Sequence, residues 1–411
     1  MPIDLSYVPA ARQAADFRTP LLLWILLFVL VVGGGVLLVL GNWPAGVPVH
    51  TPWFWFCVVF LPLACWLLLV CLVKLAQNSA QASVDDHNAA RAAWLEQAEV
   101  QAQVGISVLA VAHRYDSDDA LNDASLLAAN RLTLSTPGRQ RYFILPDQPF
   151  YPGNLRDDMD RQRAVLAWLL HDLLQQCMPV LDSLPMSQPL TFRVFIAGEL
   201  ESFELEDICH TAWQALLPSR PVSIDIVPES PSLLAIDQCL DGNSDTLSTD
   251  RLTLLCVCRL LPVLSAELPE QQTEAACMLL LAPPSIAGLP GIATLHRPVN
   301  HADPKLAIDQ ALRWGKAAPA AVQDLWQGEL DSALATALLL HGSAIGLGVI
   351  STEQLCGQHL VPSQIGQANA ASHWLTLALA IRHCMVQRQP QLVAVQENSN
   401  LQAGVIQPAE R

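Results

Sequence analysis

The chain has few positive charges and lacks the short motifs of several large enzyme classes. Among its 411 residues only Lys74, Lys305 and Lys316 are lysines, and the formal net charge is −16. A soluble part with this charge balance is not expected to bind nucleic acid or anionic lipid. The sequence contains no G-x-x-x-x-G-K, no G-x-S-x-G and no H-E-x-x-H. These absences argue against P-loop NTPases, α/β-hydrolases and HExxH metalloproteases.

Paired cysteine motifs are also missing. The chain has 11 cysteines, but none form a C-x-x-C pair and three lie inside an apolar run. This pattern is typical of free thiols in a reducing compartment. Cys256 and Cys258 lie two residues apart in an expected strand, so their side chains share one face. We interpret them as inert buried thiols, the alternative being a redox pair.

Two long apolar runs begin the chain. The first extends from Pro20 to about Leu40 and the second from about Trp53 to Val73, and neither contains a charged residue. About 20 apolar residues suffice to cross a bilayer core as a helix. A buried core helix of this length would show polar breaks, and a signal peptide would end in a small-residue cleavage site. Residues 1–76 are therefore predicted to form a transmembrane hairpin, with the lipid bilayer as a partner.

The basic residues around the hairpin predict its orientation. Arg12 and Arg18 precede the first run, Lys74 and Arg91 follow the second, and the loop Gly41–Pro52 has no Lys or Arg. Because basic residues collect on the cytoplasmic side, both ends of the hairpin are expected in the cytoplasm and the loop outside. The soluble domain of this multi-pass protein is thus predicted to be cytoplasmic.

Two features within the runs affect helix packing. Gly33, Gly34 and Gly35 would let a neighbouring helix approach closely, or would form a local flexible turn. Both interpretations stay open at the level of sequence. Pro62 in the second run is expected to kink its helix.

Helical and strand patterns alternate after the hairpin. Residues 77–103 read as a helical linker, and residues 104–411 as one α/β domain whose sheet is covered on both faces. Residues 270–281 suit either a strand or a helix. The predicted strands are residues 104–111, 141–145, 190–197, 222–227, 251–260 and 391–396. The predicted helices are residues 116–129, 161–181, 204–217, 232–241, 305–315, 317–326 and 367–388.

The order of elements from Val222 resembles the thiolase and β-ketoacyl synthase family. Residues 224–236 have the rhythm of that family's strand leading into a buried helix, and RLTLLCVCRL resembles its next strand. Segment 271–281 is similar to the family's segment of the type S-E-G-A-A-A-L-L-L. Segment 363–372 is similar to its S-x-x-G-H-x-x-A-A motif, and segment 391–396 to its last strand. The resemblance implies a thiolase-like layered α/β domain preceded by two transmembrane helices.

The departures from the family pattern bear on catalysis. Glu229 stands where the family has its nucleophilic Cys, and Gln367 stands where it has a catalytic His. His341-Gly342-Ser343 resembles the family's H-G-T motif, although its distance to Gly366 is shorter than usual. Without a thiolate and with one His replaced, acyl transfer is not expected. The chain is therefore interpreted as a pseudo-enzyme without catalytic residues; the alternative is an acyl-thioester enzyme using Glu229 or His341.

The resemblance also implies a biological setting. Degenerate proteins of this kind are encoded with bacterial type VI secretion genes, which implies an inner-membrane adaptor or chaperone for a secretion effector and a homodimeric assembly. The residues around the expected active site distinguish an interaction protein from an acyl-thioester enzyme. An enzyme needs Glu229, His341 and Gln367 to converge, whereas a binding shell can have its cleft filled by Pro228, Pro231 and Leu233.

Three further polar clusters are predicted to be structural. His296, His301 and Asp303 have no standard metal-site spacing, so a polar surface loop is favoured over a metal site. A second cluster is interpreted as a solvated helix start: Arg156, Asp157, Asp158, Asp160, Arg161 and Arg163. A third is interpreted as a loop: His113, Arg114, Asp116, Asp118 and Asp119. No metal or cofactor is predicted.

Overall fold

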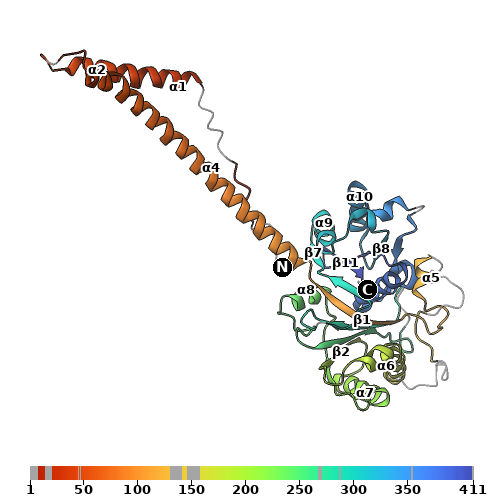
Figure 1. Ribbon diagram of the computed structural model, residues 1–411. Helices are drawn as coiled ribbons and strands as arrows, with labels where there is room; N and C mark the ends of the chain where they lie inside the picture. The colour runs from red at the N-terminus through yellow and green to blue at the C-terminus, as the bar shows by residue number, and fades with distance from the viewer. Residues whose placement is uncertain are drawn as a thin grey trace. The chain divides into compact units, whose positions relative to one another are not determined.

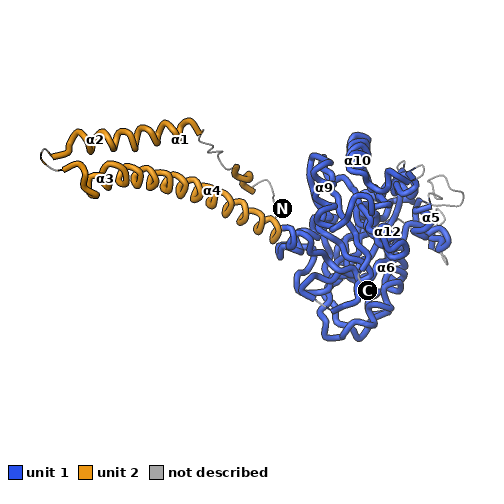
Figure 2. The backbone as a smooth tube through the Cα atoms, turned by 45° about the horizontal axis from the view of Figure 1, so that its top comes forward, with its two compact units in different colours: residues 1–2, 99–411 blue, residues 3–98 orange. Residues whose placement is uncertain are grey.

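A computed structural model describes residues 8–13, 21–44, 46, 48–129, 141–145, 158–266, 271–286, 288–352 and 355–409. The chain forms two compact units, one from residues 3–98 and one from residues 99–411 (Figure 2).

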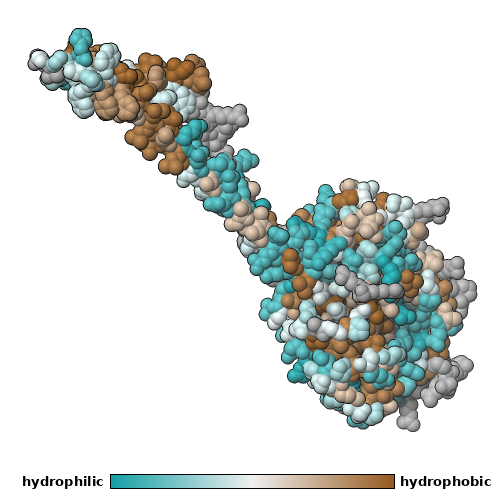
Figure 3. Space-filling view, in the orientation of Figure 1, coloured by the Kyte–Doolittle hydropathy of each residue, from teal (hydrophilic) through white to brown (hydrophobic). Residues whose placement is uncertain are grey.

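The first unit is helical and strongly apolar. Its first helical stretch joins α1 (Leu21–Phe28), a π-helical segment (Val29–Gly33) and α2 (Gly34–Asn42). Its second joins α3 (Pro52–Trp55), a π-helical segment (Phe56–Phe60) and α4 (Leu61–Ala102). Both stretches are long and apolar enough to cross a membrane. Their leucines are exposed and form much of the brown surface of this unit in Figure 3. Since α4 is continuous to Ala102, residues 77–103 extend the second stretch rather than form a separate helix.

The glycine triplet is helical and one of its members allows a close approach. A Cβ atom placed on Gly35 would lie 2.8 Å from Cβ of Pro62, so a larger residue would collide there. The rings of Phe28 and Trp66 meet edge to face, with centroids 5.0 Å apart. Of the two interpretations of the triplet, close helix packing fits the structure and a flexible turn does not. Pro62 follows the π-helical segment, as expected where a residue without an N–H interrupts the helical bonding pattern.

The second unit is built on one mixed sheet (Figure 1). The strand order is β3-β2-β4-β5-β1-β6-β11-β10-β8-β9, and β7 pairs with β11. The strands are β1 (Gly105–Arg114), β2 (Leu190–Ala197), β3 (Ser223–Ile226), β4 (Leu252–Arg259), β5 (Ala275–Ala282), β6 (Ala293–His296), β7 (Val299–His301), β8 (Asp324–Gln327), β9 (Gln358–Leu360), β10 (Gln391–Glu397) and β11 (Asn400–Pro408).

The sheet contains the same arrangement twice. In the first half, the five strands β1 to β5 lie in the order third, second, fourth, fifth, first. Taking β6, β8, β9, β10 and β11 as the five strands of the second half gives the identical order. In each half the fifth strand is antiparallel to the fourth and the first, while the second, third and fourth are parallel. The antiparallel pair β1 and β6 joins the two halves.

Helices cover both faces of this sheet. One apolar cluster joins α6 (Asp158–Ser183) and α7 (Ser202–Leu216) to side chains such as Leu254 on one face. A second joins α5 (Ala124–Ala128), α8 (Leu234–Leu240) and α12 (Ser372–Gln387) to side chains such as Leu255 on the other. In the second half, α9 (Pro304–Trp314) packs on β11 and on α10 (Ser332–Ile345). The helix α6 has the length and composition of a membrane span, but its leucines are buried in this unit.

The predicted α/β class is confirmed, and several predicted elements need correction. Residues 317–326 form a short 3₁₀ turn and β8 rather than a helix, because Pro319 interrupts the pattern and the following residues are buried in the sheet. Residues 116–123 precede the short α5 and form turns in which Asp116 and Asp118 accept backbone N–H groups.

The remaining corrections concern strands. Residues 141–145 are not a strand, and residues 270–281 contain β5. The predicted final strand, β10, is followed by β11, which was not predicted. The short strands β6, β7 and β9 were also missed; each has only three or four residues, too few for a clear alternating pattern.

Candidate functional site

The three residues singled out from the family pattern, Glu229, His341 and Gln367, contact different parts of the fold. Glu229 is exposed in the segment between β3 and α8. His341 lies on α10, where its Nε2 is 2.7 Å from Oδ1 of Asp309 on α9. Gln367 precedes α12 and pairs through its backbone with the segment before β5. Only Gln367 lines the cavity described next.

That cavity lies at the carboxyl ends of the parallel strands β8 and β9. It has a volume of about 560 Å³. Its described lining consists of Gln327, Gly328, Glu329, Leu330, Asp331, Ala335, Leu360, Pro362, Ser363, Gln367, Gln396 and Asn398. The amide nitrogen of Gln327 is buried and has no hydrogen-bond partner among the described residues. The cavity therefore presents amide and carboxylate groups.

A polar network runs behind the wall of this cavity. Nη2 of Arg259, at the end of β4, donates to Oε1 of Gln272 at 2.6 Å, and Gln272 pairs with Gln367. When the side-chain amide of Asn369 is oriented with its oxygen toward Arg259, that oxygen accepts a hydrogen bond from Nη1 of Arg259 at 2.5 Å. The backbone N–H of Asn369 donates to Oε1 of Glu329 at 2.8 Å. Burial lowers the pKa of Arg259, and the nearby Glu329 carboxylate opposes that shift.

The segment around Glu229 packs closely on α12. Oγ of Ser230 donates to the carbonyl of Ala370, and the indole of Trp374 donates to the carbonyl of Pro231. Pro231 and Leu233 are buried, whereas Pro228 is exposed. Two of the three side chains expected to fill a binding shell therefore do pack inward.

The thiols of the second unit are mostly buried. Burial raises the pKa of Cys239 on α8 to about 11, and its Sγ donates to the carbonyl of Ser248. Cys256 and Cys258 are buried, as predicted, and burial raises the pKa of both thiols well above the ordinary value, which disfavours the reactive thiolate. Cys356 is exposed, and it does not line the cavity at Gln367.

The segment with His296, His301 and Asp303 is a surface loop only at its end. It contains β6 and β7, and His296 is buried beside the backbone carbonyl of Gln103. Nδ1 of His301 accepts the backbone N–H of Asp303, whose carboxylate caps α9. Pairing with β1 and β11 buries His296 and the residues up to Val299, which the composition does not reveal, whereas Asp303 is exposed.

The two other polar clusters also differ from the prediction. Asp158 and Arg161 are buried at the start of α6; Asp158 accepts the backbone N–H groups of Leu264 and Ser265. Arg156 and Asp157 lie outside the described residues. His113 and Arg114 belong to β1 and are buried, so that cluster is only partly a loop. In each case a distant segment supplies the partners, which local sequence patterns cannot show.

The site residues that sequence reasoning missed are Gln327, Glu329, Arg259 and Asn369. Gln327 and Glu329 come directly after the predicted helix 317–326, and that helix assignment concealed the strand β8 that positions them.

No family model and no curated protein matches the chain. Many solved structures are similar to it, including the following three. The oxazolomycin ketosynthase domain OzmH KS8 of Streptomyces albus JA3453 is 14% identical, with 74% of this chain and 96% of that chain covered and a TM-score of 0.49. The ishigamide ketosynthase/chain length factor is 14% identical, with 74% and 99% covered and a TM-score of 0.45. Cerulenin-bound OleA of Xanthomonas campestris is 10% identical, with 74% and 96% covered and a TM-score of 0.41. Because these TM-scores lie below 0.5, the fold description rests on the strand order above, and no activity is taken from these neighbours.

Proposed function

We propose that the chain is a membrane-anchored, catalytically inactive thiolase-like interaction protein. The observation that carries this proposal is the cavity at Gln327 and Gln367. Its described lining contains amides and carboxylates and neither Cys nor His. Gln327-Gly328 ends a strand beside Gln367, so we assign this pair, rather than His341-Gly342, to the place of the family's H-G-T motif.

The groups in this cavity suit binding better than acyl transfer. A condensing reaction needs an activated nucleophile and a group that moves protons near neutral pH. A glutamine amide does neither, and one oxygen of Glu329 already accepts the N–H of Asn369. Amide and carboxylate groups of this kind are instead suited to hydrogen bonds with the backbone of a protein partner.

The partner and the assembly rest on the resemblance alone. By that resemblance the partner is a type VI secretion effector, the protein serves as its adaptor or chaperone, and the chain forms a homodimer. A domain tethered to a membrane raises the local concentration of its partner there, which is the advantage of such an anchor.

The location is proposed to be the bacterial inner membrane, with the second unit in the cytoplasm. The two apolar helical stretches and the basic residues flanking them support it. With exposed native cysteines replaced, a thiol reagent restricted to the periplasm should label Val49→Cys in the loop and leave Ser399→Cys unlabelled in intact cells. Labelling at Ser399 would contradict the orientation.

Intact-mass measurement with acyl thioesters tests the proposed inactivity. We expect no covalent acyl adduct on the purified protein, and we expect Glu229→Ala and His341→Ala to leave the biological role intact if both variants fold normally. A stable adduct that the His341→Ala variant loses would favour an acyl-thioester enzyme instead.

Capture from native membranes tests the binding role of the cavity. Ser363 lines the cavity and is exposed, so Ser363→Trp should fill the entrance and weaken partner capture. Ser183 is an exposed serine at the end of α6, and Ser183→Trp serves as the matched control. Equal capture by both variants would show that the partner does not use this cavity.

A further inference from the structure

A second polar cluster lies at the opposite ends of the same strands. Asp324 is the first residue of β8, His359 lies in β9 and His383 lies near the end of α12. Oδ1 of Asp324 is 2.8 Å from Nε2 of His359 and 3.3 Å from Nε2 of His383. Among the described residues, this set brings three ligand-type atoms within 4.8 Å of one another. Three separate elements thus direct two imidazoles at one carboxylate oxygen.

Neighbouring side chains hold these groups in position. Nε2 of Gln391 donates to the other oxygen of Asp324 at 3.3 Å, and Oε1 of Gln391 accepts from the indole N–H of Trp326 at 2.9 Å. The Trp326 ring also packs on His359, with centroids 4.3 Å apart. Nδ1 of His359 has no partner among the described residues, so packing on Trp326 orients this ring. Supporting groups of this kind are what orient the ligands of a metal ion.

The duplicated sheet offers a comparison for this cluster when the first paired residues of the two halves are matched. Asp324 pairs with Gln391, and the matching pair in the first half is Leu190 with Leu252. Trp326 pairs with His359 where the first half pairs Phe192 with Ile224. The aromatic position is filled in both halves, but the polar residues of the second half are replaced by leucine and isoleucine in the first.

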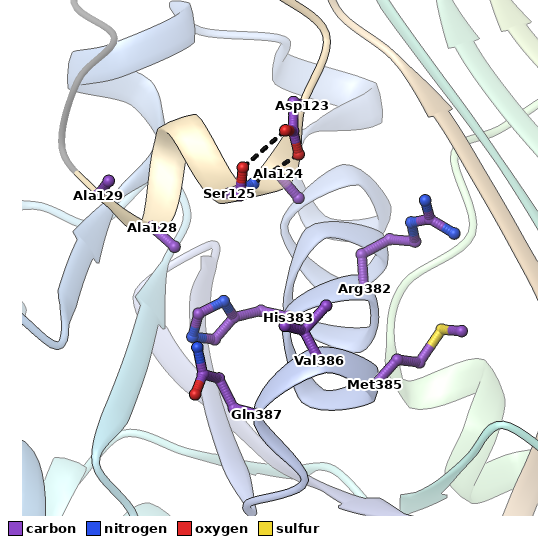
Figure 4. Close-up of a pocket in the computed structure, with 10 residues that line it drawn as sticks. All are labelled: Asp123, Ala124, Ser125, Ala128, Ala129, Arg382, His383, Met385, Val386 and Gln387. Carbon is purple, nitrogen blue, oxygen red and sulfur yellow. Dashed lines mark hydrogen bonds between the residues drawn. The ribbon is translucent and has the colours of Figure 1, made fainter.

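The cluster borders a cavity through His383. This cavity has a volume of about 560 Å³ and lies between α5 and α12. Figure 4 shows the His383 ring beside Gln387 in its wall. The side chain of His359 is 2% exposed, and those of His383 and Asp324 are 10% and 13% exposed. An ion held by the three ligands would lie beside the one ligand, His383, that lines this cavity.

We propose that Asp324, His359 and His383 bind one divalent transition-metal ion, with Zn²⁺ as the best match. Zinc takes His nitrogen and Asp oxygen ligands, and its usual bond lengths place tetrahedral ligand atoms about 3.3–3.4 Å apart. The two separations in the cluster, 2.8 and 3.3 Å, need only a small outward movement to reach that geometry. Each neutral imidazole would then coordinate through Nε2 and carry its proton on Nδ1.

The proposed ion has a defined coordination. Two neutral imidazoles and one carboxylate supply three ligands and one negative charge, and water from the cavity completes the set. Sites with three protein ligands and one open position are typical of zinc that binds an exogenous group. The cavity would admit water or a small anion to that position.

Metal binding by the full chain in detergent tests this site. After treatment with a chelator, the protein should take up one Zn²⁺ per chain by isothermal titration, and Co²⁺ should give the visible absorption bands of a tetrahedral site. His383→Ala and His359→Gln should abolish both signals, and Gln391→Ala should weaken binding about 10-fold to 100-fold. Circular dichroism establishes whether each variant is folded.

His341→Ala is the matched control, because His341 also lies 2.7 Å from a carboxylate but belongs to no three-ligand cluster in the part of the chain that the structure describes. It should bind Zn²⁺ as tightly as the parent protein. The proposal is overturned if the folded parent protein takes up no metal, or if His341→Ala loses binding as His383→Ala does. The Co²⁺ spectrum with a folded His359→Gln variant keeps the test valid if His383→Ala does not fold.

Discussion

Two buried polar clusters in the second unit compensate their buried charges in different ways. Arg161 and Glu274 are both fully buried and form a two-point ion pair, with Nη1 to Oε1 at 2.8 Å and Nη2 to Oε2 at 2.7 Å. Glu274 also accepts the backbone N–H groups of Phe143 and Leu261. Asp324, by contrast, shares one oxygen between two imidazoles beside a cavity. The first cluster is closed and joins segments of the fold, whereas the second is open to an added ligand.

A buried charge without any partner should destabilise the fold more than either cluster does. Leu254 lies in β4, between β2 and β5, and is fully buried. Leu254→Asp would bury a carboxylate without a cation or donors arranged for it, which is enough to unfold a marginally stable domain. We expect loss of cooperative thermal unfolding measured by circular dichroism. Leu254→Met should fold normally, and an unchanged melting curve for the Asp variant would refute the burial of this strand.

Removing one member of the closed pair should have the next largest effect. Arg161→Met leaves Glu274 charged and buried, so the free energy of unfolding should fall by about 3–5 kcal/mol. The double variant Arg161→Met with Glu274→Leu should recover only part of that loss, because the unpaired charge is gone but the backbone N–H groups of Phe143 and Leu261 lose their acceptor. Urea denaturation of the two single variants and the double variant measures both effects. A loss below about 1 kcal/mol in the single Arg161 variant would mean that water reaches the pair.

His113 gives a smaller, pH-dependent effect. Burial, with Arg382 and Arg114 nearby, lowers the pKa of His113 from 6.5 to about 3. Below pH 6.5 the unfolded chain therefore binds a proton that the folded chain does not, and stability falls as the pH decreases through this range. At pH 5 the cost is about 2 kcal/mol.

His113→Phe should remove this part of the pH dependence. Chemical denaturation of both proteins at pH 7 and pH 5 should show a smaller stability loss for the variant. Parallel losses in the two proteins would indicate that the His113 ring is protonated in the folded state. His341→Phe, on a more exposed helix, controls for the general effect of losing a histidine.

The sequence was sufficient for the long elements and insufficient for the long-range contacts. Helix α6 and strands β2 and β4 follow clear periodic patterns and were predicted close to their observed bounds. Strands β6, β7 and β9 are short, and residues far along the chain decide that they become strands. The polar segment His296 to Asp303 was assigned to a surface loop for the same reason.

The candidate site was only partly predictable. Gln367 was singled out from the sequence and lines the cavity, although it precedes α12 and does not begin the helix as predicted. Gln327 was missed because the residues before it were assigned as helix instead of β8. The cluster of Asp324, His359 and His383 has no regular spacing in the sequence. It is assembled by the parallel pairing of β8 with β9 and by the packing of α12, and both depend on tertiary structure.

The place of β11 in the sheet has a consequence for biosynthesis. This strand is the last in chain order, yet it lies between β10 and β6 inside the sheet. While the ribosome is still making residues 400–408, β6 and β10 have no partner on their facing edges, and unpaired edges invite association with other chains. The first five strands are complete by Ala282 and can pair earlier. A nascent chain that stalls before Asn400 would therefore carry a finished first half beside an open second half, a form that chaperones and proteases would be expected to recognise.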